Sequence, residues 1–72
     1  MDFVIHKIEI LHTGSLSFTR GEVLQKYYPG YTVIDLGDYN QASGVWIVLE
    51  KDGDQIKLEF RKISYIIHHK LD

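Results

Sequence analysis

The chain has no cysteine in its 72 residues. Disulfide bridges and thiolate zinc sites are therefore excluded as supports for the fold, and no residue points to an oxidising compartment. Buried apolar side chains must hold the fold together. Because a chain of this length buries only about 60% of its unfolded surface, we expect one domain, residues 1–72, of modest stability.

Long apolar runs and a strong net charge are lacking as well. No segment approaches the roughly 20 apolar residues of a membrane-spanning helix, and Asp2 stands where a secretory signal would be basic. We therefore expect a soluble, cytoplasmic protein with no membrane partner. The formal charge of −2 gives no overall attraction toward phosphates.

Motifs of catalysis and metal binding are scarce. The sequence has no glycine-rich phosphate loop and no nucleophile elbow, so we expect a non-enzyme without a cofactor. Four histidines are present. His6 and His12 would lie about 20 Å apart along an extended strand, too far to share one ion, so we expect no metal site and instead a response of these residues to pH.

A β-hairpin is the clearest element that the sequence does contain. The runs 45–50 and 55–60 flank Asp52-Gly53, a dipeptide suited to the positive φ angles of a type I′ turn. This turn fixes the register, and it places apolar residues on one face and mixed residues on the other. The facing apolar pairs are Val45 with Phe60, Ile47 with Leu58, and Leu49 with Ile56.

A helix is predicted over residues 20–28. Thr19 and Glu22 have the spacing of a capping box, Phe18 and Val23 that of a hydrophobic staple, and Pro29-Gly30 ends the run. Gly21 weakens such a short helix, so it should dock on the sheet rather than stand alone.

Three further segments complete the expected fold. Residues 3–11 predict a strand with a bulge or with burial on both faces, and residues 63–67 predict either a strand or one helical turn. In residues 31–36, alternation puts Ile34 and Leu36 on the apolar face. A loop over 37–44 leads to the hairpin.

These elements predict an α+β fold, an antiparallel four- to five-stranded sheet with one helix packed on one face, in the approximate order βαβββ. The alternative is a small SH3-like barrel. The predicted core is formed by the helix and the apolar sheet face: Val23, Leu24, Ile34, Leu36, Val45, Ile47, Leu49, Ile56, Leu58 and Phe60.

A single helix cannot cover both faces of this sheet, so an aromatic patch is expected on the uncovered face. It comprises Tyr31, Val33, Trp46 and Val48. Such patches tend to be binding surfaces, and we expect a non-catalytic protein-binding module, an inhibitor or adaptor of a larger partner. Burial of Trp46 under the rest of the chain, or a homodimer through this patch, are the other interpretations.

Nucleic-acid binding is the alternative function. Lys57, Arg61 and Lys62, with Tyr65 and Trp46 as stacking residues, could form a basic aromatic surface. The neighbouring Glu50 and Glu59 oppose it. Four tyrosines form a further candidate contact rim or stacking platform near the end of the predicted helix: Tyr27, Tyr28, Tyr31 and Tyr39.

Overall fold

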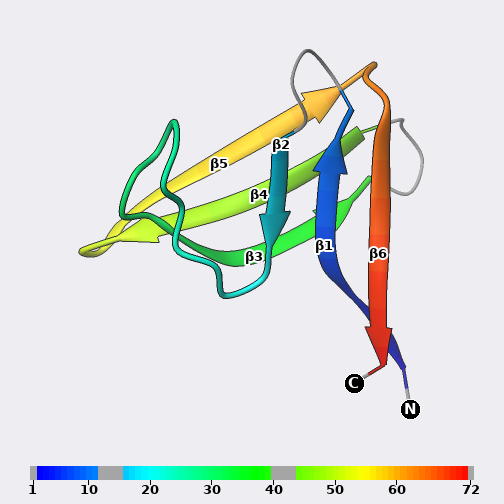
Figure 1. The fold of residues 1–72 in the computed structure, drawn as a ribbon, viewed down its shortest axis with the longest axis horizontal. Helices are drawn as coiled ribbons and strands as arrows, with labels where there is room; N and C mark the ends of the chain where they lie inside the picture. Colours follow the sequence, from blue (N-terminus) through cyan, green and yellow to red (C-terminus); the bar gives the residue numbers. More distant parts are fainter. Residues whose placement is uncertain (1, 12–15, 40–43, 72) are drawn as a thin grey trace.

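The computed structural model describes residues 2–11, 16–39 and 44–71, and these residues form six β-strands and no helix. Hydrogen bonds join the strands into two antiparallel three-stranded sheets, ordered β2-β1-β6 and β3-β4-β5 (Figure 1). The expected α+β class is therefore wrong, because the described chain is all-β. The alternative SH3-like barrel shares that class with the structure. The strands are β1 (Phe3–Ile10), β2 (Leu16–Thr19), β3 (Thr32–Asp38), β4 (Gly44–Lys51), β5 (Asp54–Arg61) and β6 (Tyr65–Leu71).

The β4-β5 hairpin confirms the predicted turn and register. Asp52 and Gly53 have φ angles of 51° and 83°, as a type I′ turn requires. Lys51 pairs with Asp54, and the pairing continues without interruption to the far end of the hairpin. The local turn chemistry therefore suffices to set all three predicted apolar pairs.

The predicted helix is instead an irregular connection between β2 and β3. The capping-box contact does form, because Glu22 Oε1 accepts a hydrogen bond from the Thr19 N–H at 3.0 Å. However, Gly21 turns to a φ of 86°, and the chain then runs beside the start of β3. The Val33 N–H donates to the Glu22 carbonyl at 2.8 Å, and the Leu24 N–H donates to the Tyr31 carbonyl at 2.8 Å. These bonds satisfy an edge of β3 that a short helix would have left open.

A bulge in β3 changes which of its residues face the core. Val33 pairs with Leu49, but the next pair joins Asp35 to Val48, so Ile34 is the extra residue. The predicted faces are therefore correct for Asp35 and Leu36, and wrong from Tyr31 to Ile34. Val33 is completely buried and Ile34 is 39% exposed, the reverse of the prediction.

The side chain of Arg20 ties this bulge to the other sheet. Its Nη1 donates to Asp35 Oδ1 at 3.0 Å, and its Nη2 donates to the Ile5 carbonyl at 3.2 Å. Asp35 Oδ1 also accepts a hydrogen bond from the Leu36 N–H at 2.9 Å. The Asp35 carboxylate thus stabilises the local kink, and the Arg20 guanidinium links it to β1.

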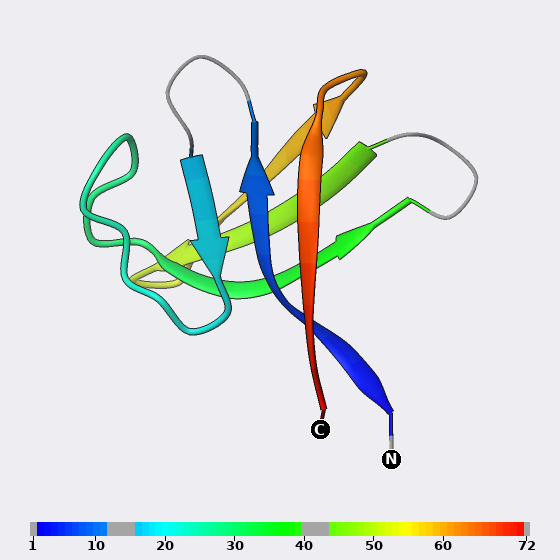
Figure 2. The ribbon, with the colours of Figure 1, turned by 45° about the vertical axis from the view of Figure 1, so that its right-hand side comes forward.

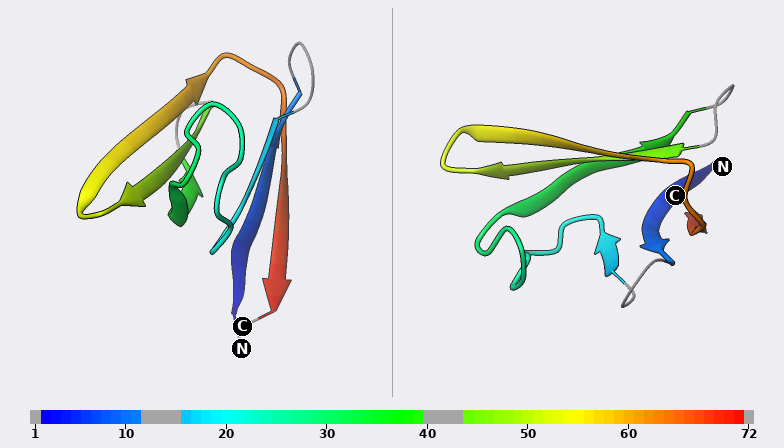
Figure 3. Two further views of the ribbon diagram at one scale, coloured as in Figure 1. Left: turned by 60° about the vertical axis from the view of Figure 1, so that its left-hand side comes forward. Right: turned by 90° about the horizontal axis from the view of Figure 1, so that it is seen from above.

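The second sheet performs the role expected of the helix. β1 lies between β2 and β6 (Figure 2), with a register shift between Ile5 and Lys7 that confirms the predicted bulge. The C-terminal segment, for which the sequence predicted either a strand or one helical turn, is the strand β6. Seen from above, this sheet lies on the inner side of β3-β4-β5 (Figure 3), so a sheet rather than a helix packs against the inner face.

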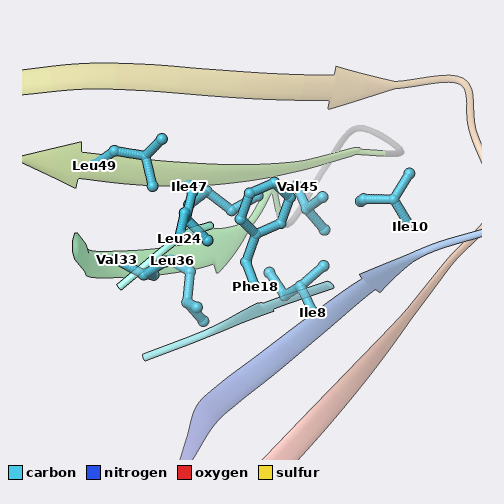
Figure 4. Packing of buried hydrophobic residues seen from close by; sticks show 9 residues of the cluster. All are labelled: Ile8, Ile10, Phe18, Leu24, Val33, Leu36, Val45, Ile47 and Leu49. Atoms are coloured by element: carbon cyan, nitrogen blue, oxygen red, sulfur yellow. The ribbon is translucent and has the colours of Figure 1, made fainter. Parts of the chain in front are cut away.

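The core lies between the two sheets (Figure 4). Five of its buried residues were predicted, namely Leu24, Leu36, Val45, Ile47 and Leu49, and four were not, namely Ile8, Ile10, Phe18 and Val33. The hairpin residues Ile56, Leu58 and Phe60 pack against the core while partly exposed. Val23 is 50% exposed and does not belong to it, because the strand-like connection turns its side chain away.

Candidate functional site

Trp46 lies on the outer face of β4, opposite Gly37 in β3. A Cβ atom placed on Gly37 would lie 2.5 Å from Cζ2 of Trp46. The absence of a side chain at Gly37 therefore lets the indole lie against the backbone of the neighbouring strand. The ring is partly buried by the sheet beneath it, and it remains partly accessible.

Lys57 lies near both Trp46 and a second aromatic ring, Tyr39, and a second cation, Arg61, lies over Tyr39. The Lys57 ammonium lies 5.6 Å from the indole centroid and 5.8 Å from the ring centroid of Tyr39. The Arg61 guanidinium lies 4.2 Å from the Tyr39 centroid. Cations at these distances over aromatic faces are attracted to them, which restricts the rings and the long side chains together.

Glu59 completes this arrangement. One of its carboxylate oxygens, Oε2, accepts hydrogen bonds from the Tyr39 hydroxyl and from Arg61, the latter at 3.3 Å. The hydroxyl of Tyr39, followed by the charges of Lys57 and Arg61, lowers the pKa of Glu59 below its ordinary value of 4.5. We name these residues the outer-face cluster: Tyr39, Trp46, Lys57, Glu59 and Arg61.

The four predicted protein-binding residues do not share one surface. Trp46 and Val48 lie on the outer face, both half-buried. Val33 is buried in the core because of the bulge, and Tyr31 lies on the same side of β3 as Val33. Tyr31 packs edge-on to Tyr28, with ring centroids 6.1 Å apart. The expectation of one continuous patch is therefore corrected to an outer face centred on Trp46.

The residues predicted for nucleic-acid binding are also divided. Lys57 and Arg61 belong to the outer-face cluster, and Lys62 lies in the turn after β5 with a φ of 55°. Tyr65 pairs with Ile10 in the other sheet and packs against the core. The structure thus brings together two of the three basic residues with Trp46 and leaves Tyr65 elsewhere.

The sequence indicated Glu59 as a neighbour of the basic residues, but it did not indicate Tyr39 as a member of this site or its contact with Glu59. Tyr39 was grouped with three other tyrosines near the predicted helix, and Tyr28 and Tyr31 do pack together. The alternation Asp35, Gly37, Tyr39 carries the missing signal, because after the bulge these residues share the outer side with Trp46. Residues 40–43 of the expected loop lie outside the described residues, as does His12.

An apolar groove opens on the opposite side of β5. It has a volume of about 420 Å³ and lies between β2, the connection 24–28 and β5. Phe18 and Phe60 meet in its wall with ring centroids 5.9 Å apart, and Lys26 and Glu59 supply its polar lining. The remaining lining residues are Leu16, Leu24, Tyr27, Tyr28 and Leu58.

The rest of the described chain offers little other chemistry. Residues 2–11, 16–39 and 44–71 contain no group of three or more acidic, histidine or cysteine side chains placed to hold a metal ion. His68 and Glu9 form a pair across β6 and β1, with Nε2 and Oε1 2.6 Å apart. No helix in this part of the chain is long and apolar enough to cross a membrane.

Comparison of the chain with protein families, with curated proteins and with solved structures finds no match.

Proposed function

We propose that the protein is a small non-catalytic protein-binding module, an inhibitor or adaptor of a larger partner, which it contacts through the outer face of β3-β4-β5. The observation that carries this proposal is the position of Trp46, held against Gly37 and still partly accessible. We also propose that it acts in the cytoplasm, with which a cysteine-free chain is compatible.

The composition of the outer-face cluster supports a protein partner. Trp, Tyr and Arg are the residues most enriched among those that dominate binding energy at protein interfaces. Here Tyr39 and Arg61 are restrained before binding by their mutual contact and by Glu59, and Trp46 is restrained by Gly37 beneath it and by Lys57 over its ring. Restrained side chains lose less conformational entropy when a partner docks, so the cluster is preorganised for a contact.

Capture from the native host tests this proposal. A photo-crosslinking residue at Val48, beside the cluster, should link a partner that mass spectrometry identifies, and Trp46→Ala should abolish the crosslink. Ile66→Ala is the matched control, because Ile66 is an exposed apolar residue of the other sheet. A partner that binds the purified wild type and Trp46→Ala equally well contradicts the proposed surface.

Nucleic-acid binding remains the second candidate because Lys57 and Arg61 lie together with Trp46 and Tyr39. Glu59 opposes it by placing a carboxylate in the same cluster, and Lys57 and Arg61 lie over aromatic faces on which bases would stack. If single-stranded oligonucleotides bind, the affinity should fall steeply with salt, with a log–log slope of about −0.7 for each phosphate neutralised. Absence of binding at low ionic strength excludes this function.

A further inference from the structure

β5 is an uninterrupted edge strand. Within its sheet it has β4 as a hydrogen-bonded neighbour on one side, and no other backbone hydrogen bond of the described residues reaches it. It is eight residues long, has no bulge and contains no proline. Natural edge strands are usually shortened, bulged, covered or protected by charged side chains, which prevents pairing with another chain. β5 is neither short nor bulged nor covered, and its charged side chains are of both signs, so they can pair with those of a second copy.

The hairpin register identifies the backbone groups that face outward. A two-residue turn closes on a hydrogen-bonded pair, here Lys51 with Asp54, and such pairs then alternate along the ladder. Ile56, Leu58 and Phe60 therefore bond to β4. The N–H and C=O groups at the open edge belong to the alternate residues, Gln55, Lys57, Glu59 and Arg61.

We propose that this edge pairs with β5 of a second copy of the chain, antiparallel and centred on Leu58, to form a symmetric dimer. In this register each Lys57 lies opposite Glu59 of the second copy, and each Gln55 lies opposite Arg61. All four residues have edge-facing backbone groups, so these positions become hydrogen-bonded pairs. The side chains of Lys57 and Glu59 are complementary in charge at the same positions.

Charge selects this register over its neighbours. Centring the pairing on Lys57 places two lysines directly opposite each other, and centring it on Glu59 places two glutamates opposite each other. Like charges in facing positions destabilise a sheet. Registers centred on Ile56 or Phe60 keep the backbone pairing but shorten the overlap of the two strands.

β3, the other edge of the same sheet, is bulged at Ile34 and is hydrogen-bonded near its start to residues 21–24. The edges of the other sheet lack this complementarity. β6 (Tyr65–Leu71) carries two histidines and a lysine and has no carboxylate, so two copies of it cannot form opposite-charge pairs. β2 has only four residues. A second β5 is therefore the occupant that the sequence of the edge itself specifies.

The dimer has consequences for both faces of the sheet. The two-fold axis is perpendicular to the sheet. The single interface occupies the β5 edge of both copies, so the assembly closes as a dimer. On the inner side, Ile56 faces Phe60 of the second copy and extends the apolar groove. On the outer side, the two outer-face clusters lie on one continuous six-stranded surface. The inference goes beyond the proposed function and does not depend on it.

Charge reversal provides the test. Sedimentation equilibrium should show a dimer of the wild type that dissociates on dilution. Lys57→Glu and Glu59→Lys each create two like-charge pairs per dimer, so each should raise the dimer Kd by about tenfold or more. Mixing the two variants should restore association, because the glutamate introduced at position 57 of one chain then faces the lysine introduced at position 59 of the other. Lys70→Glu, on β6, is the control and should leave the Kd unchanged.

Backbone hydrogen exchange tests the same register without any substitution. The amides of Ile56 and Leu58 should be protected at every concentration, because they bond to β4. Those of Lys57 and Glu59 should become protected only as the concentration rises through the dimer Kd. A monomeric wild type up to near-millimolar concentration overturns the proposal. So does a dimer that both reversals leave intact, one that Lys70→Glu weakens equally, or one in which the Lys57 and Glu59 amides exchange freely.

Discussion

The indole of Trp46 rests on Gly37, a residue with no side chain to hold it away from the sheet. This relationship explains how a large aromatic residue can lie on the outer face while remaining partly buried. It also fixes the orientation of the ring within the outer-face cluster, on which the proposed binding surface depends.

Gly37→Ala should therefore destabilise the protein although the strand backbone there accepts alanine. The new Cβ would lie 2.5 Å from Trp46 Cζ2, so the ring must move, and we expect a loss of about 1 to 3 kcal/mol in the free energy of unfolding. In a Trp46→Ala background the same substitution should be neutral or stabilising by about 0.5 kcal/mol, because alanine loses less backbone entropy. Urea denaturation of the four proteins measures this coupling. Equal effects in both backgrounds would show that the ring does not lie on Gly37.

The type I′ turn predicts a different kind of glycine effect. Gly53 has a φ of 83°, and a Cβ added there would meet no atom within 4 Å. The alanine side chain therefore fits in Gly53→Ala, but the backbone must adopt a left-handed conformation that alanine disfavours. We expect a cost of about 1 to 2 kcal/mol from the left-handed backbone alone. Asp52→Asn should be nearly neutral, because asparagine tolerates positive φ. Thermal or urea denaturation measures both changes, and a neutral Gly53→Ala would contradict the turn type.

The core predicts a clear ranking of apolar truncations. Phe18 is 1% exposed between the two sheets, and Phe18→Ala should cost about 3 to 5 kcal/mol. Phe60→Ala should cost less, about 2 to 3 kcal/mol, since Phe60 lines the groove and is only partly buried. Val23→Ala should change stability by less than about 0.5 kcal/mol. If Val23→Ala were instead the most destabilising of the three, the result would contradict this core and favour the helix predicted from the sequence.

The pKa of Glu59 links stability to pH. Because the folded-state pKa is lowered, the stabilisation by Glu59 is fully present above its unfolded pKa, near 4.5, and is lost as the pH falls through the folded value. Tyr39→Phe removes the largest cause and should move the pKa upward toward 4.5. Titration of the Glu59 carboxyl carbon by NMR in both proteins measures the change. A pKa at or above 4.5 in the wild type contradicts the hydrogen-bonded geometry.

The sequence predicted those elements whose structure is set by neighbouring residues, and it failed where contacts between distant residues decide the structure. The β4-β5 hairpin was predictable in full because Asp52-Gly53 sets the register by itself. The segment after Thr19 was not, because only the Glu22 half of its capping box forms and the open edge of β3 competes for the backbone groups that follow. The hydrogen bonds between this segment and β3 thus favour the irregular connection over the helix.

The bulge at Ile34 explains the main error in the site. It reverses the faces of Tyr31 and Val33, and strict alternation cannot reveal an extra residue in a strand. Trp46, Val48 and Lys57 kept their predicted face because they lie in the uninterrupted hairpin. Tyr39 and Glu59 were missed as partners because their contact joins β5 to the end of β3, far apart in sequence.

Acrylamide quenching of the single tryptophan tests the proposed binding surface most directly. In the free protein, we expect Trp46 to be quenched more slowly than a free indole and faster than a fully buried one. Saturating amounts of the captured partner should then reduce the quenching rate strongly. An indole already shielded in the free monomer, or one quenched at the same rate with and without the bound partner, would contradict a binding surface centred on Trp46.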